Sequence, residues 1–287
     1  MPLISAPFPL ELTTTTAWAP APAALASIAC SAAAYAAGSL TVSGAVAATL
    51  VGVASLIAGW DWGVLLLLFF LSGTGWSHLG RAGKEARTAG VVAKGGRRDA
   101  AQVLANGGVF AVAAVGYWVS GRVGYGPEGA LAWRAVGLGA LAAATADTWA
   151  TEVGTLWGGM PRSLLTGEAV PPGTSGGVTS IGTLAGVAGA IGLGIGGIAL
   201  GWGLASATAG LLGGIGGMLA DSLLGATAQS RRWCERCNAL TERAIHTCGL
   251  ATRRAGGLAW LDNDGVNAVS TALGALLGWA LLRVVGS

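Results

Sequence analysis

Carboxylate side chains stand near the ends of several long apolar segments of this chain. Asp147 and Glu152 lie in the stretch "TADTWATEVGT", and Asp221 lies in "GGIGGMLADSLLGATAQ". Acidic groups within or beside a membrane segment are costly and therefore indicate a functional site. Carboxylates suit Mg²⁺, which keeps bound waters and bridges substrate phosphates. We therefore take Asp147, Glu152 and Asp221 as candidate ligands of Mg²⁺.

The spacing of the first two acids leaves their relationship open. Five residues of chain take Asp147 to Glu152, which places the two side chains about 140° apart around an ideal helix. They can share one ligand only if the helix breaks near Thr151; otherwise they serve different ligands. Asp221 shares a helical stripe with glycines, which predicts an acid pressed against another helix or a ligand. The stripe comprises Gly214, Gly217, Asp221 and Gly225.

Two further segments carry polar side chains at positions i, i+3 and i+7, which lie on one face of a helix. These are Asp99, Gln102 and Asn106 in "RRDAAQVLANGG", and Asp264, Asn267 and Thr271 in "LDNDGVNAVST", with Asp262 just before the second stripe. Amides in membrane helices often serve only to join helices, and a single acid at a helix end is often a cap. Their convergence on segment ends favours a polar site.

The stretch "GTSGGVTSIGT", residues 173–183, follows two prolines and opens an apolar segment. It can be a plain linker or a cradle for phosphate. A helix N-terminus offers free N–H groups and the positive end of the helix dipole, and neighbouring cations can neutralise phosphate charge. The candidate phosphate-binding residues are Gly173, Thr174, Ser175, Gly176 and Gly177 in this loop, together with Lys94, Arg97 and Arg98.

A cysteine-rich loop, residues 230–263, contains "RRWCERCNALTERAIHTCG". Its four soft ligands, Cys234, Cys237, His246 and Cys248, form a C-x-x-C followed by an H-x-C. This set suits a tetrahedral structural Zn²⁺ site, although the second pair is more closely spaced than usual. A redox pair and incidental thiols are the alternatives.

The composition identifies the elements that must position these residues. The chain is 53% hydrophobic and only 10% charged, against about 25% charged residues in soluble domains. We therefore predict residues 1–287 to be one all-α domain, a polytopic transmembrane bundle of about seven to eight spans. The apolar runs of suitable length are 20–39, 41–59, 62–77, 101–120, 130–150, 181–200, 204–228 and 265–284. The 50 glycines favour close packing of helices, either within the chain or in a homo-oligomer.

Basic residues predict the orientation of the bundle. The loops 78–99 and 230–263 carry 12 of the 16 Lys and Arg residues, and such loops face the cytoplasm. An even number of spans separates them, so the two assignments agree. The loop 151–180 then also faces the cytoplasm. We expect an integral protein of a prokaryotic inner membrane, with the acids and the glycine-rich loop on the cytoplasmic side.

Five blocks in order resemble one family of integral membrane proteins. The blocks are "KGGRRDAAQVLANGG", "ADTWATEVGTL", "GTSGGVTSIGT", "LADSLLGATAQ" and "LDNDGVN". The chain is identified as a member of the family of the plastid and cyanobacterial phytyl-phosphate kinases, many of whose bacterial, archaeal and animal members have no assigned activity. This family is distantly similar to dolichol kinase and to membrane cytidylyltransferases that use CTP.

The resemblance implies transfer of a phosphate from a nucleoside triphosphate, with CTP expected, to an isoprenoid monophosphate such as phytyl or geranylgeranyl phosphate. We then expect the three acids to be catalytic, the glycine-rich loop and the cations to bind phosphate, and Gln102 and Asn106 to orient a phosphate or the base. Asp262, Asp264 and Asn267 would bind the metal or support its ligands. The expected partners are the nucleotide, the lipid phosphate and the membrane, and no nucleic acid.

Three other functions compete with this one. A cytidylyltransferase would join CMP to the lipid phosphate and release pyrophosphate. A transporter would place its polar residues near the middle of the bilayer, whereas here they collect at segment ends. A purely structural membrane protein would not need so many acids on one side.

Overall fold

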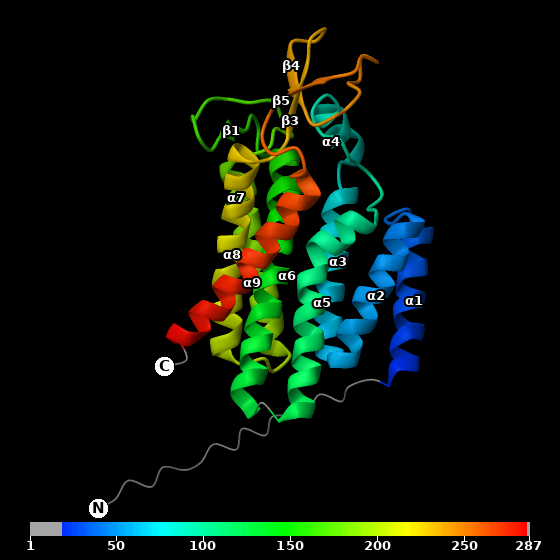
Figure 1. Cartoon of the computed structure of the whole chain (residues 1–287), viewed down its shortest axis with the longest axis vertical. Helices are drawn as coiled ribbons and strands as arrows, with labels where there is room; N and C mark the ends of the chain where they lie inside the picture. The colour runs from blue at the N-terminus through cyan, green and yellow to red at the C-terminus, as the bar shows by residue number, and fades with distance from the viewer. Residues whose placement is uncertain (1–18, 125, 286–287) are drawn as a thin grey trace, which may run out of the picture.

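A computed structural model describes residues 19–124 and 126–285 of the chain. Within these residues, eight long helices stand side by side and alternate in direction, and a short helix and five short strands gather at one end of the bundle (Figure 1). The helices are α1 (Pro20–Ala36), α2 (Val42–Ala58), α3 (Trp60–His78), α4 (Arg81–Thr88), α5 (Ala100–Val123), α6 (Gly126–Trp157), α7 (Ser180–Ala199), α8 (Leu204–Thr227) and α9 (Asn263–Val285).

The prediction of an all-α membrane bundle is confirmed, but the predicted number of spans is not. Among the described residues, five helices, α5 to α9, are long and apolar enough to cross a membrane. The count rises to six if α3 and α4, which bend by 75° at their junction, form one span. The 17-residue helices α1 and α2 are shorter, and a helix of that length extends only roughly 25 Å.

Helix α6 forms the centre of the bundle. It packs against α5, α7, α8 and α9, and 67% of its apolar window is buried, against 33–44% in the other four. Small residues make this packing close, because backbones can approach where no side chain intervenes. A Cβ on Gly274 would lie 2.6 Å from the carbonyl oxygen of Gly139, and a Cβ on Gly213 would lie 2.5 Å from that of Gly274. These glycine faces are therefore used for packing inside the chain.

A second group of helices, α1, α2, α3 and α5, stands beside this core (Figure 1). The start of α5 is tied to the turn between α1 and α2. The backbone N–H of Thr41 donates to the carbonyl of Arg98 at 3.0 Å, and the N–H of Arg98 donates to that of Ser39 at 3.0 Å. These bonds place the "KGGRRD" segment against the ends of α1 and α2.

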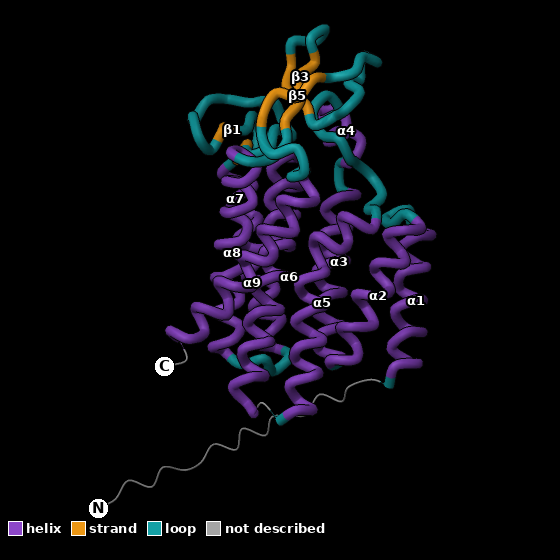
Figure 2. Tube along the Cα trace, viewed as in Figure 1, coloured by secondary structure: helices purple, strands orange, loops and turns teal. Residues whose placement is uncertain are grey.

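Three segments form a cap at one end of the bundle, which we define as residues 79–99, 158–179 and 228–262 (Figure 2). Strands β1 (Arg162–Ser163) and β2 (Gly177–Val178) pair with each other. Strand β3 (Arg231–Cys234) pairs with β4 (Ala239–Thr241) on one side and β5 (Arg253–Gly256) on the other, all antiparallel. The three loops that we predicted to share a membrane face thus lie at one end of the bundle.

Candidate functional site

A polar cavity of about 740 Å³ lies where the cap meets the helix ends. It is lined by every predicted catalytic or phosphate-binding residue except Arg97. These residues are Lys94, Arg98, Gln102, Asn106, Asp147, Glu152, Gly173, Thr174, Ser175, Gly176, Gly177, Asp221, Asp262, Asp264 and Asn267. Segments from across the chain therefore converge on a single cavity.

Asp147 on α6 and Asp221 on α8 face each other in this cavity. Their carboxyl groups lie within hydrogen-bonding reach of one another, and the Ser270 hydroxyl donates to Asp221 at 2.7 Å. The packing explains the pairing. A Cβ on Gly217 would lie 2.6 Å from the Cβ of Ala143, and each acid follows its contact residue by four positions, one helical turn. Two carboxyl groups so close together must share a proton or a cation.

Glu152 lies on another side of the cavity. Helix α6 continues unbroken to Trp157, so the break that would let Glu152 share a ligand with Asp147 does not occur. The Glu152 carboxylate instead forms an ion pair with Lys84, which is buried, and accepts a hydrogen bond from Ser77 at 2.6 Å. The two acids of this segment therefore face different partners.

Arg98 and Arg97 are adjacent in sequence but differ in position. Arg98 points into the cavity, half-buried, and its nearest side-chain partners, Thr74 and Ser77, are each 3.5 Å away. Desolvation lowers the pKa of its guanidinium, and the charge of Glu152 opposes that shift. Arg97 instead donates to the carbonyl of Leu40 at 2.7 Å and lies over the Tyr35 ring, outside the cavity lining. Of these two arginines, only Arg98 presents its guanidinium to the cavity, where donors beyond those used by Thr74 and Ser77 can meet an anion.

The polar stripe at the start of α5 has a structural use. Asp99 and Gln102 form a capping box, in which each side chain accepts a hydrogen bond from the other's backbone N–H, at 3.0 and 3.1 Å. Lys94 bridges Asp99 and Asp264, linking α5 to α9. The hydrogen bond from Lys94 lowers the pKa of Asp99. Asn106 donates to the carbonyl of Gln102 at 2.9 Å and also lines the cavity.

The glycine-rich loop lies on the end of α8. Gly176 has a φ of 73°, and a Cβ there would lie 2.5 Å from the Cα of Ala226. A Cβ on Gly225 would lie 3.0 Å from the backbone nitrogen of Gly176. Because Gly225 and Asp221 are one turn apart on α8, the loop lies one turn beyond the acid pair.

A second cavity, of about 580 Å³, lies among α1, α2, α3 and α5. Its walls are mainly apolar, with Val51, Leu66, Phe69 and Phe70 among them. The two cavities share four residues, and these are polar: Arg98, Gln102, Asn106 and Thr148. The apolar cavity thus meets the polar cavity at the positively charged side chain of Arg98.

Two residues that the sequence did not single out also line the polar cavity, Lys84 and Glu242. Lys84 lies in the charged run "RAGKEART", which is typical of a solvated helix. Glu242 lies between the cysteine pairs and accepts from Ser175 at 2.8 Å and from Gln229 at 2.7 Å. Desolvation raises the pKa of Glu242, and these hydrogen bonds oppose the shift. No local pattern distinguishes either residue, since both depend on contacts with distant segments.

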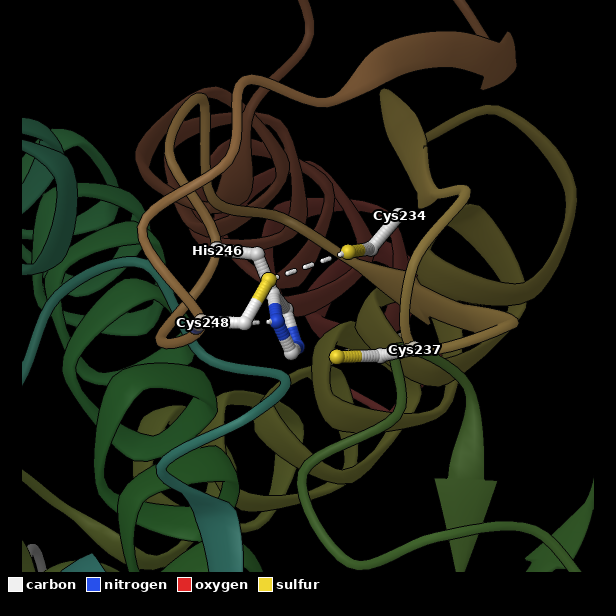
Figure 3. Close-up of side chains that lie close together, drawn as sticks. All are labelled: Cys234, Cys237, His246 and Cys248. Atoms are coloured by element: carbon white, nitrogen blue, oxygen red, sulfur yellow. Dashed lines mark hydrogen bonds between the residues drawn. The ribbon is translucent and has the colours of Figure 1, made fainter.

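The cysteine-rich loop brings its four predicted ligands together (Figure 3). The ligand atoms of Cys234, Cys237, His246 and Cys248 all lie within 4.8 Å of one another. A hydrogen bond from the backbone of Leu250 lowers the pKa of Cys248 to about 6, while the neighbouring Cys248 raises that of Cys237 to about 11.

Comparison with known proteins assigns the family. Residues 25–275 match the family described as integral membrane protein DUF92. The chain is 32% identical over 257 residues to Protein PGR of Arabidopsis thaliana, covering 83% of this chain and 88% of that protein. It is 32% identical over 239 residues to an uncharacterized membrane protein of Methanocaldococcus jannaschii, covering 82% of each chain.

A third relative, an uncharacterized membrane protein of Synechocystis sp., is 29% identical over 224 residues, covering 76% of this chain and 73% of that protein. No solved structure matches the chain. The distant similarity to dolichol kinase stays a prediction. The family assignment suggested by the five sequence blocks is confirmed: the chain belongs to the DUF92 family of integral membrane proteins.

Proposed function

We propose that this protein transfers a phosphate from a nucleoside triphosphate, with CTP as the expected donor, to an isoprenoid monophosphate such as phytyl or geranylgeranyl phosphate. The observation that carries the proposal is the meeting of the two cavities at Arg98. A prenyl phosphate is an apolar chain with an anionic head. The apolar cavity among α1, α2, α3 and α5 suits the chain, and the free donors of Arg98 suit the head.

The paired acids suit Mg²⁺. Asp147 and Asp221 present carboxyl groups within reach of each other, and oxygen ligands of this kind are those that Mg²⁺ prefers. Held by these two carboxylates, the ion would neutralise charge on the donor phosphates. The glycine-rich loop, one turn beyond the pair, would hold the nucleotide phosphates through its backbone N–H groups. Glu152, held by Lys84 and Ser77, would position Arg98 rather than the ion.

The reaction needs little proton transfer. An oxygen of the lipid phosphate attacks the terminal phosphorus of the nucleotide, the bond from that phosphorus to the bridging oxygen breaks, and the nucleoside diphosphate leaves. Because the attacking oxygen is already anionic, no strong general base is required. Positioning and neutralisation of charge therefore carry the catalysis, and this cavity offers groups for both.

The orientation follows from the same proposal. The cap contains 13 of the 16 Lys and Arg residues, which favours a cytoplasmic location. The nucleotide would then enter from the cytoplasm, and the lipid would enter from the bilayer between the helices.

Analysis of reaction products tests the proposal. Purified protein in detergent with Mg²⁺ is incubated with phytyl, geranylgeranyl or farnesyl monophosphate and each nucleoside triphosphate, and products are identified by mass spectrometry. We expect a lipid diphosphate and CDP. A CMP-linked lipid with pyrophosphate would instead identify a cytidylyltransferase. No product with any pair, from folded protein, would refute nucleotide-dependent chemistry on these lipids.

Filling the apolar cavity is expected to shorten the preferred substrate. Ala48 on α2 lines this cavity about two helical turns from the end at Arg98, so Ala48→Phe places a ring across the path of a long chain. We expect kcat/KM for geranylgeranyl monophosphate to fall at least about tenfold relative to that for farnesyl monophosphate, because a lost apolar contact in a pocket carries an effect of this size. Initial rates with the two lipids measure the ratio.

Leu50→Phe is the matched control for this prediction. Leu50 lies on the same helix and is 64% exposed, outside the cavity lining. The same added ring should leave the ratio between the two lipids unchanged. An equal loss with both lipids in Ala48→Phe would show that the chain does not bind in this cavity.

A further inference from the structure

The cysteine-rich loop is built from two turns that resemble each other. Cys234 ends β3, and Cys237 lies in the turn that leads to β4. The next residue, Asn238, has a φ of 50°. In the second turn His246 accepts a backbone hydrogen bond from Gly249 at 2.9 Å, and Gly249, directly after Cys248, has a φ of 84°. Each turn thus presents two ligands and is followed by a left-handed residue.

The spacing of the ligand atoms fits one tetrahedral ion. The sulfurs of Cys234 and Cys248 are 3.6 Å apart. A Zn–S bond of about 2.3 Å in a tetrahedron gives a sulfur-to-sulfur edge of about 3.8 Å. The cysteines are free thiols, and the imidazole of His246 lies among them (Figure 3). The backbone N–H of Cys248 donates to Nδ1 of His246 at 3.4 Å, and an ion bound at that nitrogen would replace this long hydrogen bond.

A redox pair explains this arrangement less well. A C-x-x-C pair needs only two thiols, whereas here a third thiol and an imidazole complete a set of four. Four protein ligands leave no open position for a substrate, which is the property of a structural zinc site.

The segment between the two turns reaches the polar cavity. The hydroxyl of Thr241 donates to the carbonyl of Val91 at 3.2 Å, and the backbone N–H of Glu242 donates to the same carbonyl at 2.9 Å. The Glu242 carboxylate accepts from Ser175 in the glycine-rich loop and from the backbone of Ala93 at 3.3 Å. One short segment therefore joins all three parts of the cap.

We propose that Cys234, Cys237, His246 and Cys248 bind one structural Zn²⁺, which fixes the segment that carries Glu242 against the glycine-rich loop. The small sheet formed by β3, β4 and β5 has few apolar residues of its own. Metal binding supplies stability to such units directly, and small zinc domains unfold without the ion. The ion would thus be a structural part of the cap, and this role does not depend on the phosphate-transfer proposal.

Metal analysis of the purified full chain tests the site. We expect about one Zn²⁺ per chain after dialysis against metal-free buffer, and loss of most of it in Cys237→Ser, whose thiol is exposed and whose replacement disturbs packing little. Cys30→Ser is the matched control, since Cys30 lies on α1 and should leave the zinc content unchanged. Protein that holds no zinc after expression with added zinc, or equal content in all three proteins, would overturn the site.

Limited digestion with trypsin tests this structural role of the ion. Arg236 is exposed between Cys234 and Cys237, and proteases cut such a bond only when the segment opens. Cleavage after Arg236 should accelerate at least about tenfold when Zn²⁺ is removed by a chelator or by Cys237→Ser, and should return to its slow rate when zinc is restored to the wild-type chain. If zinc binds but its removal leaves the cleavage rate unchanged, the structural role is refuted. Both readouts are independent of phosphate transfer, so their outcome is separable from that of the product analysis.

Discussion

Asparagine at Asp147 or at Asp221 is expected to lower phosphate transfer by at least about a hundredfold, the effect typical of losing one group that stabilises transition-state charge. The substitution keeps the size of the side chain and removes its charge. Because the two carboxyl groups lie within reach of each other, their repulsion without a cation is also removed. We therefore expect the Mg²⁺-free melting temperature to stay the same or rise while activity is lost. Initial rates and thermal unfolding in detergent measure the two effects.

Glu128→Gln is the matched control for these variants. Glu128 is an exposed acid on α6, the helix that carries Asp147, at the end opposite the cap. The same change from carboxylate to amide there should alter neither quantity. If Asp147→Asn and Asp221→Asn both keep near-normal activity, the metal assignment is wrong. If both proteins unfold instead, the acids serve the packing of α6 and α8.

The helices could be predicted because apolar runs of about 20 residues have few alternatives to a membrane helix. The residues at which the helices end were harder to predict. The predicted span 130–150 ends where the apolar run ends, but α6 continues to Trp157, since a helix can extend beyond the hydrocarbon for as long as its backbone bonds continue. This extension keeps Asp147 and Glu152 on different sides of one unbroken helix. The composition predicts which part of a helix lies in the hydrocarbon. The helix itself ends where its backbone hydrogen bonds end, and composition does not predict that residue.

The site was predictable as a set of residues but not as a geometry. The glycine stripe that contains Asp221 correctly predicted a face pressed against another helix. Nothing in the local pattern could identify Asp147 as its partner, because that depends on which helix α8 meets. Likewise Arg97 and Arg98 are equivalent in sequence, and only the contact with the turn between α1 and α2 separates the structural arginine from the one in the cavity.

The cap shows the largest gap between sequence and structure. Its five strands are two to four residues long, too short for a periodic pattern to predict them. Glu242 acquires its importance from Ser175 and Ala93, which are far from it in sequence. The cysteine spacing was a clear local signal in this part of the chain, because a metal site requires particular ligand types at short intervals.

Gly176→Ala is expected to lower both the stability and the activity of the protein. Two causes act together, backbone strain at Gly176 and a steric clash with α8. A left-handed conformation costs a residue with a Cβ about 1–2 kcal/mol. At Gly176, where φ is 73°, the new Cβ would also lie 2.5 Å from the Cα of Ala226, within the backbone of α8. Overpacking of this kind adds about 1–3 kcal/mol. The loop must then move away from α8, and with it the backbone N–H groups that we assign to the nucleotide phosphates.

Gly167→Ala separates these two contributions. Gly167 lies in the same part of the cap with a φ of 71°, but nothing lies within 4 Å of the position of its Cβ. Gly167→Ala should therefore be destabilised by backbone strain alone, and its nucleotide KM should be unchanged. Gly176→Ala should melt at a lower temperature than Gly167→Ala and show a raised nucleotide KM. Melting curves and nucleotide titrations on the two variants make the comparison. Equal melting temperatures would mean that the loop does not rest on α8, and a normal nucleotide KM in a destabilised Gly176→Ala would mean that the loop packs there without binding phosphate.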